Sequence, residues 1–116
     1  MQENNDIKLE QKGEVTIMNI RGDITSFSET PLTDSFQKVV AQRARKIILN
    51  FDKDAYINSG GIALLIQMMY QIRENKQKAA ITGLSDHFKK IFNMVGITKF
   101  ANIFDTVNDA LEELAG

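Results

Sequence analysis

The chain begins with two short stretches in which apolar and polar residues alternate. Residues 7–12 and 15–20 both follow a period at or near two, as expected of β-strands with one covered face. Between them lies the polar segment Lys12-Gly13-Glu14, which has the composition of a tight turn. The pattern therefore predicts an antiparallel hairpin.

Later segments carry apolar residues at helical spacing, and each begins at a residue that can cap a helix. The expected helices lie at about 28–40, 59–75, 85–95 and 106–114. The expected caps are Ser28 or Thr30, a residue at or beside Ser59, Ser85, and Thr106. The first helix should bury one stripe, made of Leu32, Phe36, Val39 and Val40.

Strands are expected between these helices. Residues 46–51 form a nearly continuous apolar run, which is typical of a strand covered on both faces, and 79–82 and 100–104 are shorter candidates. Strands that alternate with helices after a hairpin indicate an α/β fold. We expect a mixed sheet of four to five strands with about four helices packed against it, in a single domain over residues 1–116. The polar start, residues 1–6, is expected to be flexible.

Composition narrows the class of protein. The chain has 116 residues, no cysteine, and a formal net charge of −1 without a long basic run, so nucleic acid is not expected as a partner. No apolar run approaches the length of a membrane span, so no direct membrane insertion is expected, and the polar start lacks the features of a signal peptide. The expected location is the cytoplasm. Neither a metal nor a cofactor is predicted.

The chemistry is concentrated at the start of the second expected helix. Ser59 is followed by Gly60 and Gly61, which places its hydroxyl near free backbone amides that tolerate an anion, including a phosphate on Ser59 itself. Two glycines would also leave the hydroxyl unshielded. In the alternative interpretation, Ser59 only caps a helix and the glycines only form a turn.

The sequence around Ser59 resembles the signature of the STAS domain (sulfate transporter and anti-sigma factor antagonist). The resembling segments run in order along nearly the whole chain: 20–24, 57–62, 83–97 and 103–111. The resemblance implies the STAS fold and a stand-alone anti-sigma factor antagonist. The sequence departs from the family pattern at Thr25, Asn50 and Asn58, where relatives often carry acidic residues.

The resemblance also implies a mechanism. Unmodified antagonists bind an anti-sigma factor that is also a serine-protein kinase; the kinase phosphorylates the antagonist and breaks the complex, and a serine phosphatase restores it. By position, the phosphoacceptor here is Ser59. The partner-binding residues expected around it are Asp23, Thr25, Asn58, Gly60, Gly61, Leu64 and Met68.

Leu64 and Met68 enter that set through helical periodicity. At about 100° per residue, one side of the helix should face the core, and it carries Ile62, Leu65, Ile66, Met69, Ile72 and Arg73. Leu64 should then point away from the core and Met68 to one flank, forming an apolar strip beside Ser59. Alternatively, both are merely isolated exposed apolar residues, which are common.

Enzymatic function is not expected. The segment 52–63 lacks the glycine and glutamate of a calcium loop, and Ser59 with the single histidine, His87, makes a poor catalytic triad. A second functional class stays open: a free STAS accessory subunit that docks on a membrane transporter or its ATPase.

Overall fold

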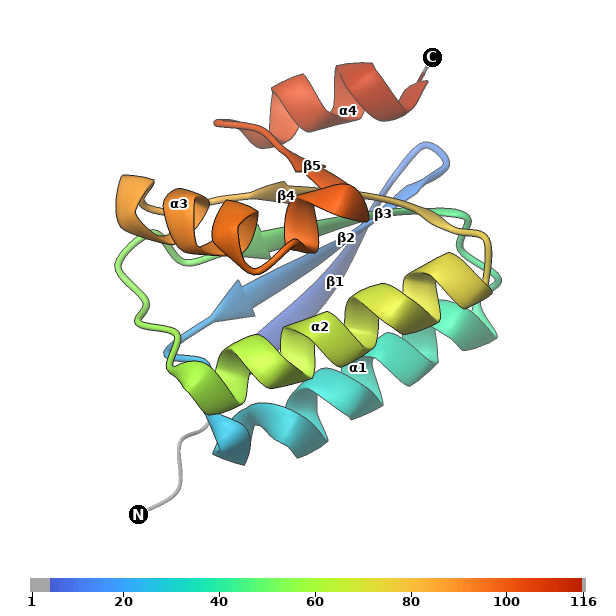
Figure 1. Ribbon diagram of the computed structural model, residues 1–116. Coiled ribbons are helices and arrows are strands. Elements are labelled where there is room, and N and C mark those ends of the chain that lie inside the picture. Colours follow the sequence, from blue (N-terminus) through green and yellow to red (C-terminus); the bar gives the residue numbers. More distant parts are fainter. Residues whose placement is uncertain (1–4, 116) are drawn as a thin grey trace.

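The computed structural model describes residues 5–115, which form a five-stranded sheet in the order β1-β2-β3-β4-β5 (Figure 1). The strands are β1 (Asp6–Lys12), β2 (Val15–Arg21), β3 (Lys46–Phe51), β4 (Lys78–Thr82) and β5 (Ala101–Ile103). The first pair is antiparallel, with Lys12 opposite Val15, and the remaining pairs are parallel. The predicted hairpin and the mixed sheet are both confirmed.

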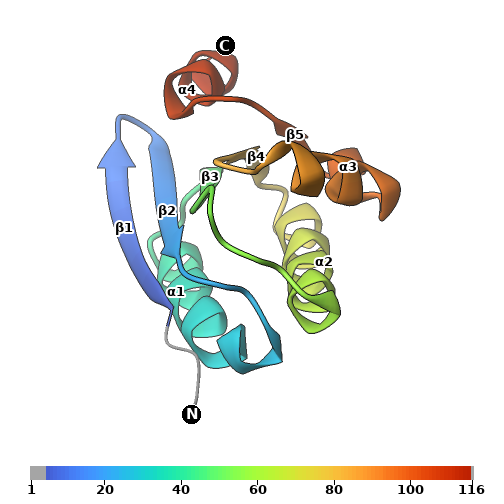
Figure 2. The same ribbon diagram turned by 90° about the vertical axis from the view of Figure 1, so that its left-hand side faces the viewer.

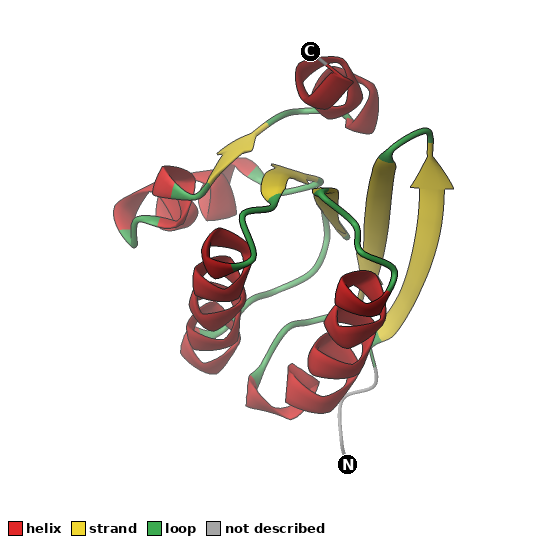
Figure 3. Ribbon diagram, turned by 90° about the vertical axis from the view of Figure 1, so that its right-hand side faces the viewer, coloured by secondary structure: helices red, strands yellow, loops and turns green. Residues whose placement is uncertain are grey.

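Four α-helices and two short 3₁₀ turns accompany the strands within this described range, and α4 follows the last strand. They are η1 (Ser26–Ser28), α1 (Glu29–Ala41), α2 (Ser59–Glu74), α3 (Asp86–Met94), η2 (Ile97–Lys99) and α4 (Val107–Ala115). Helices α1 and α2 lie on one side of the sheet and α4 lies on the other (Figures 2 and 3). None of these helices has the length and apolar character needed to cross a bilayer.

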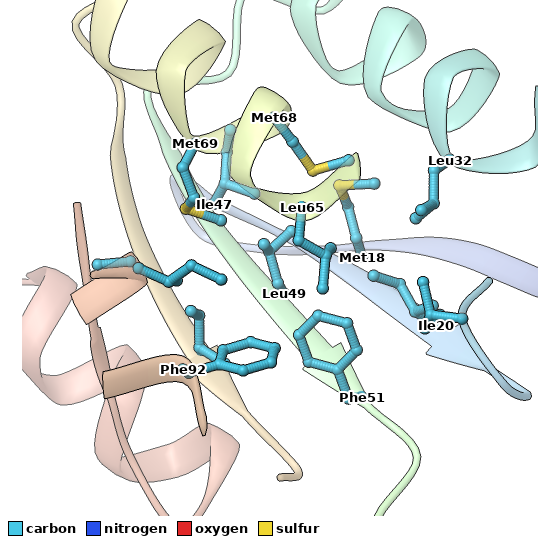
Figure 4. Close-up of a cluster of buried hydrophobic side chains, with 14 of the residues drawn as sticks. Met18, Ile20, Leu32, Ile47, Leu49, Phe51, Leu65, Met68, Met69 and Phe92 are labelled. Atoms are coloured by element: carbon cyan, nitrogen blue, oxygen red, sulfur yellow. The ribbon is translucent and has the colours of Figure 1, made fainter. Parts of the chain in front are cut away.

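The larger core lies between the sheet and α1, α2 and α3. Alternation along β3 explains how one strand serves two cores: Ile47 and Leu49 face this side, whereas Ile48 joins the smaller cluster beneath α4. Figure 4 shows Phe51 and Phe92 within the larger cluster, where their rings meet edge to face at 5.9 Å between centroids. Burial on both faces accounts for the nearly continuous apolar sequence of β3.

A polar row crosses the other face of the sheet. Thr82 Oγ1 donates a hydrogen bond to Asn50 Oδ1 (2.8 Å), and Asn50 Nδ2 donates to Asn19 Oδ1 (2.8 Å). Asn50 therefore joins β2, β3 and β4 through its uncharged amide, which both donates and accepts.

Two local expectations need correction. Ser28, one of the two expected caps of α1, does occupy the N-cap position but makes no side-chain cap bond to that helix; its Oγ accepts a hydrogen bond from the Thr25 backbone N–H instead. The expected flexible start extended to residue 6, yet Asp6 begins β1, and Asn5 Nδ2 donates hydrogen bonds to the carbonyls of Arg21 and Asp23. The rest of that expectation falls on residues 1–4, outside the described range.

Candidate functional site

The loop over residues 52–58 leads from β3 to the start of α2, where Asn58 caps the helix. Its backbone is extended (φ −90°, ψ −178°), and its Oδ1 accepts the backbone N–H of Gly61 at 2.9 Å. Ser59 is the first helical residue, and it is exposed. The cap is thus supplied by the residue beside Ser59, which leaves the serine side chain at the surface.

A second segment, residues 22–28, holds this loop in place. Ile24 and Ile57 form an isolated parallel bridge, in which the Ile24 N–H donates to the Tyr56 carbonyl (2.9 Å) and the Asn58 N–H donates to the Ile24 carbonyl (3.1 Å). The Asp23 carboxylate accepts the Tyr56 N–H at 2.9 Å. The start of α2 is therefore fixed by a segment more than thirty residues earlier in the chain.

The two glycines have a packing function that the sequence did not reveal. A Cβ on Gly61 would lie 2.3 Å from the Ile24 carbonyl oxygen, and one on Gly60 would lie 3.0 Å from the Ser26 backbone nitrogen. The distance at Gly61 is too short for any side chain, and the one at Gly60 is tight enough that the neighbouring backbone would have to shift by a few tenths of an ångström. The glycines allow the helix start to approach residues 24–26 closely. This contact is absent from both predictions for the glycines, an unshielded Ser59 hydroxyl and a turn, because it depends on a segment distant in the sequence.

Thr25 and Ser28 organise η1 through a reciprocal capping box. Thr25 Oγ1 accepts the Phe27 N–H (3.1 Å), and Ser28 Oγ accepts the Thr25 N–H (3.0 Å). The hydroxyl of Thr25 and the carboxylate of Asp23 thus already shape the loops around Ser59. Their contact with a partner stays a prediction.

Two aromatic side chains beside these loops were missed by sequence reasoning. Phe27 of η1 is 62% exposed, and Tyr56, in the loop over residues 52–58, is 59% exposed. Tyr56 is oriented by an edge-to-face contact with Phe88 of α3 at 5.8 Å between centroids. Large aromatic residues in loops, without helical or strand periodicity around them, were the available signal.

The predicted apolar strip does not exist as an exposed surface. Met68 is only 5% exposed and belongs to the main core, and Figure 4 shows its side chain pointing toward Met18 of β2. Leu64 is half-buried and packs against the same core. Because α1 covers the same face of the sheet as α2, the flank of α2 that single-helix periodicity assigns to solvent is partly enclosed (Figures 1 and 2).

A sequence model of the STAS domain matches residues 6–110, which is most of the chain. This protein belongs to the STAS domain family.

Solved structures agree with the fold of this STAS domain. An anti-sigma factor antagonist from Mycobacterium paratuberculosis matches with a TM-score of 0.83 and 14% identity, over 100% of both chains. A putative anti-sigma factor antagonist from Thermotoga maritima matches with a TM-score of 0.82 and 15% identity, over 95% of both chains. The anti-sigma factor antagonist SpoIIAA in its unphosphorylated form matches at 0.70 and 16% identity, over 96% of this chain and 99% of that one.

Proposed function

We propose that this STAS domain is a cytoplasmic anti-sigma factor antagonist in a partner-switching circuit, with Ser59 as its phosphoacceptor. The unphosphorylated form binds an anti-sigma factor that is also a serine-protein kinase. Phosphorylation of Ser59 releases that partner, and a serine phosphatase restores binding. The protein acts by binding and carries no catalytic step of its own. The family match and the resemblance of the fold to anti-sigma factor antagonists support this class of function.

The observation that carries the proposal is the exposure of Ser59 on a rigidly held helix start. Two other serines lie at helix starts. Ser28, at the end of η1, is fully buried, and Ser85, before α3, is half-buried with its hydroxyl accepting the Phe88 N–H. Ser26 is exposed but lies in the short turn η1. Ser59 combines exposure with the amino end of a 16-residue helix, whose dipole favours a negative group. One relative, SpoIIAA, has been solved in its phosphorylated form.

A phosphate on Ser59 would change this surface strongly. It adds about −1.5 to −2 charges at neutral pH. The exposed aromatic rings of Phe27 and Tyr56 stand on the two loops that flank the helix start. A partner that covers these rings would have to desolvate the phosphate as well, which is costly unless a cation meets it. Release of the partner follows if the partner offers an apolar surface at that point.

The decisive experiment combines phosphosite mapping with binding. The purified protein is incubated with candidate anti-sigma kinases from its own organism, and the modified residue is identified by mass spectrometry. We expect phosphate on Ser59, retained kinase binding for Ser59→Ala without phosphorylation, and loss of binding for Ser59→Asp. The matched control is Ser26→Ala, which removes the neighbouring exposed hydroxyl and should be phosphorylated normally.

Phosphate chiefly on Ser26 or Ser85 would contradict the assignment of Ser59. Co-purification with a membrane transporter or its ATPase, and with no kinase, would contradict the partner-switching function and support the accessory-subunit alternative.

A further inference from the structure

Five basic residues gather at the end of the molecule opposite Ser59. They lie in the turns that follow α1 and α2 and at the starts of β3 and β4: Arg43, Arg45, Lys46, Lys76 and Lys78. We call this set the basic end. The two turns are joined by hydrogen bonds from the Lys78 N–H to the Arg45 carbonyl (2.8 Å) and from Gln77 Nε2 to the Ala44 carbonyl (2.9 Å). Figure 1 shows them side by side, away from the start of α2.

Both turns hold a basic residue in a conformation that favours glycine. Arg43 has φ 60° and Lys76 has φ 57°. Both helices end in the same hydrogen-bonding pattern. After α1, the N–H groups of Arg43 and Ala44 donate to the carbonyls of Val40 and Val39, respectively. After α2, the N–H groups of Lys76 and Gln77 donate to the carbonyls of Arg73 and Ile72. Glycine is the favoured residue at this position. The helix dipole favours cations near the carboxyl end of a helix, but that preference is equally met by positions other than the left-handed one.

The adjoining strands place like charges next to each other. Lys46 and Lys78 are partners in the parallel register of β3 and β4, so two cationic residues stand on neighbouring strands. Within residues 5–115, Lys46 is the one member of the basic end that has a salt bridge, to Glu14 at 3.6 Å. Two basic residues thus occupy left-handed positions where glycine would be less strained, and such departures from local preference are expected at functional surfaces.

The shape of this end suits an extended ligand. A groove of about 410 Å³ lies beside Arg43 and Arg45, with Gln11, Gln42 and the Glu14–Lys46 ion pair in its walls. A second groove, of about 360 Å³, is lined by the same two arginines and by Asn75 and Gln77. Amide side chains can both donate to and accept from a peptide backbone, while arginine pairs with carboxylates through two parallel hydrogen bonds.

We propose that the basic end is a second interaction surface, which binds an acidic segment of a partner protein. Charge complementarity selects an acidic ligand, although the whole chain has a net charge of −1. A membrane or RNA fits less well. The exposed large apolar side chains of the described residues, Phe27, Tyr56, Tyr70, Met94 and Val95, all lie outside the two turns, so none is there to enter a bilayer or stack on a base. Glu14, which pairs with Lys46, and Glu74 weaken the positive field for every anionic ligand, so the acidic segment would pair with Arg43, Arg45, Lys76 and Lys78.

The basic end acts independently of Ser59. Helix α2 has 16 residues, so its two ends are about 24 Å apart, well beyond the screening length at physiological salt. A partner at Ser59 and an acidic segment at the basic end can therefore bind at the same time.

Fluorescence anisotropy with a labelled peptide of alternating glutamate and serine tests the proposal on the full chain. Binding should be saturable, should weaken as salt is raised, and should be absent for the same peptide with glutamine in place of glutamate. The double variant Arg43→Gly/Lys76→Gly should bind roughly tenfold more weakly, since two charge pairs are lost. Its melting temperature should not fall, because glycine suits both turns.

The matched control is Lys8→Gln/Lys90→Gln, which removes the same charge from exposed positions outside the basic end and should leave the affinity unchanged. Ser59→Asp should also bind the peptide normally, which keeps this test separate from the function proposed for Ser59. Equal binding by Arg43→Gly/Lys76→Gly would overturn the proposal. So would the absence of peptide binding, or preferential binding to phosphatidylserine vesicles or to single-stranded RNA.

Discussion

Neighbouring residues at the start of α2 carry separate tasks. Asn58 caps the helix through Gly61, which frees the adjacent Ser59 side chain from any structural duty in that cap. Asparagine is among the strongest capping residues, and it caps the helix without adding a charge. The cap therefore rests on Asn58, and Ser59 can be replaced or modified without loss of it.

Gly61→Ala tests how closely the helix start must approach Ile24. The new Cβ would lie 2.3 Å from a backbone oxygen, so we expect a loss of about 2–4 kcal/mol in the free energy of unfolding. Ser59→Ala is the control and should change that free energy by about 0.5 kcal/mol or less, since the side chain is exposed. Chemical denaturation measures both. Equal stability of the two variants would show that this contact is loose in solution.

The orientation of α2 is decided by its neighbours. Its most deeply buried residues are Gly61, Leu65, Met68, Met69 and Ile72. Ile62 and Ile66, predicted to face the core, are only half-buried, and exposed Arg73 lies over the ring of Phe100 at 4.3 Å from its centroid. The buried arc is thus turned toward α1, because α1 and α2 share one face of the sheet and enclose side chains between them (Figure 2).

Met68→Ala distinguishes a core position from a surface position on this helix. We expect a loss of about 2–4 kcal/mol in the free energy of unfolding, because the thioether fills space within the main core. Gln67→Ala, at the exposed preceding position, should change it by about 0.5 kcal/mol or less. If both variants melt alike, Met68 lies at the surface, as predicted from the periodicity of this helix alone.

At the scale of the whole molecule, the sheet separates two surfaces. Because β2 to β5 run parallel, the segments leaving β2 and β3 meet at one end and carry the Ser59 site. The segments entering β3 and β4 meet at the other end and carry the basic end. Ligand sites in open α/β sheets commonly lie beyond the carboxyl ends of the strands, as the Ser59 site does.

A salt bridge between distant segments gives the molecule a pH dependence. Lys89 of α3 donates to Asp105, which precedes α4, and this bond holds the pKa of the Asp105 carboxyl below its usual range. A lowered pKa in the folded state contributes stability at neutral pH that is lost as the pH falls through that pKa. Asp105→Asn should therefore be slightly less stable than the wild type at neutral pH. The difference is small, because the carboxylate is exposed.

Unfolding free energies measured across the acidic range check this prediction. The two proteins should converge once Asp105 is protonated. A difference that persists unchanged at low pH would show that the substitution acts through packing and not through charge.

The sequence alone determined the elements and the family of this protein. Period-two alternation, the apolar run of β3 and the capping residues Ser85 and Thr106 are local signals, and all led to the observed elements. The segment around Ser59 was likewise found from contiguous residues. Local signals suffice here because secondary structure and short motifs depend mainly on neighbours along the chain.

The tertiary structure alone decided the contacts between segments far apart in the sequence. Gly61 is confined by Ile24, Asp23 holds Tyr56, and Met68 is enclosed on the side toward α1. The basic end likewise arises because parallel strands bring the short basic stretch 43–46 next to the turn that carries Lys76, although the chain shows no long basic run. Periodicity identifies the apolar side of one helix, but which residues are covered depends on the second helix packed beside it.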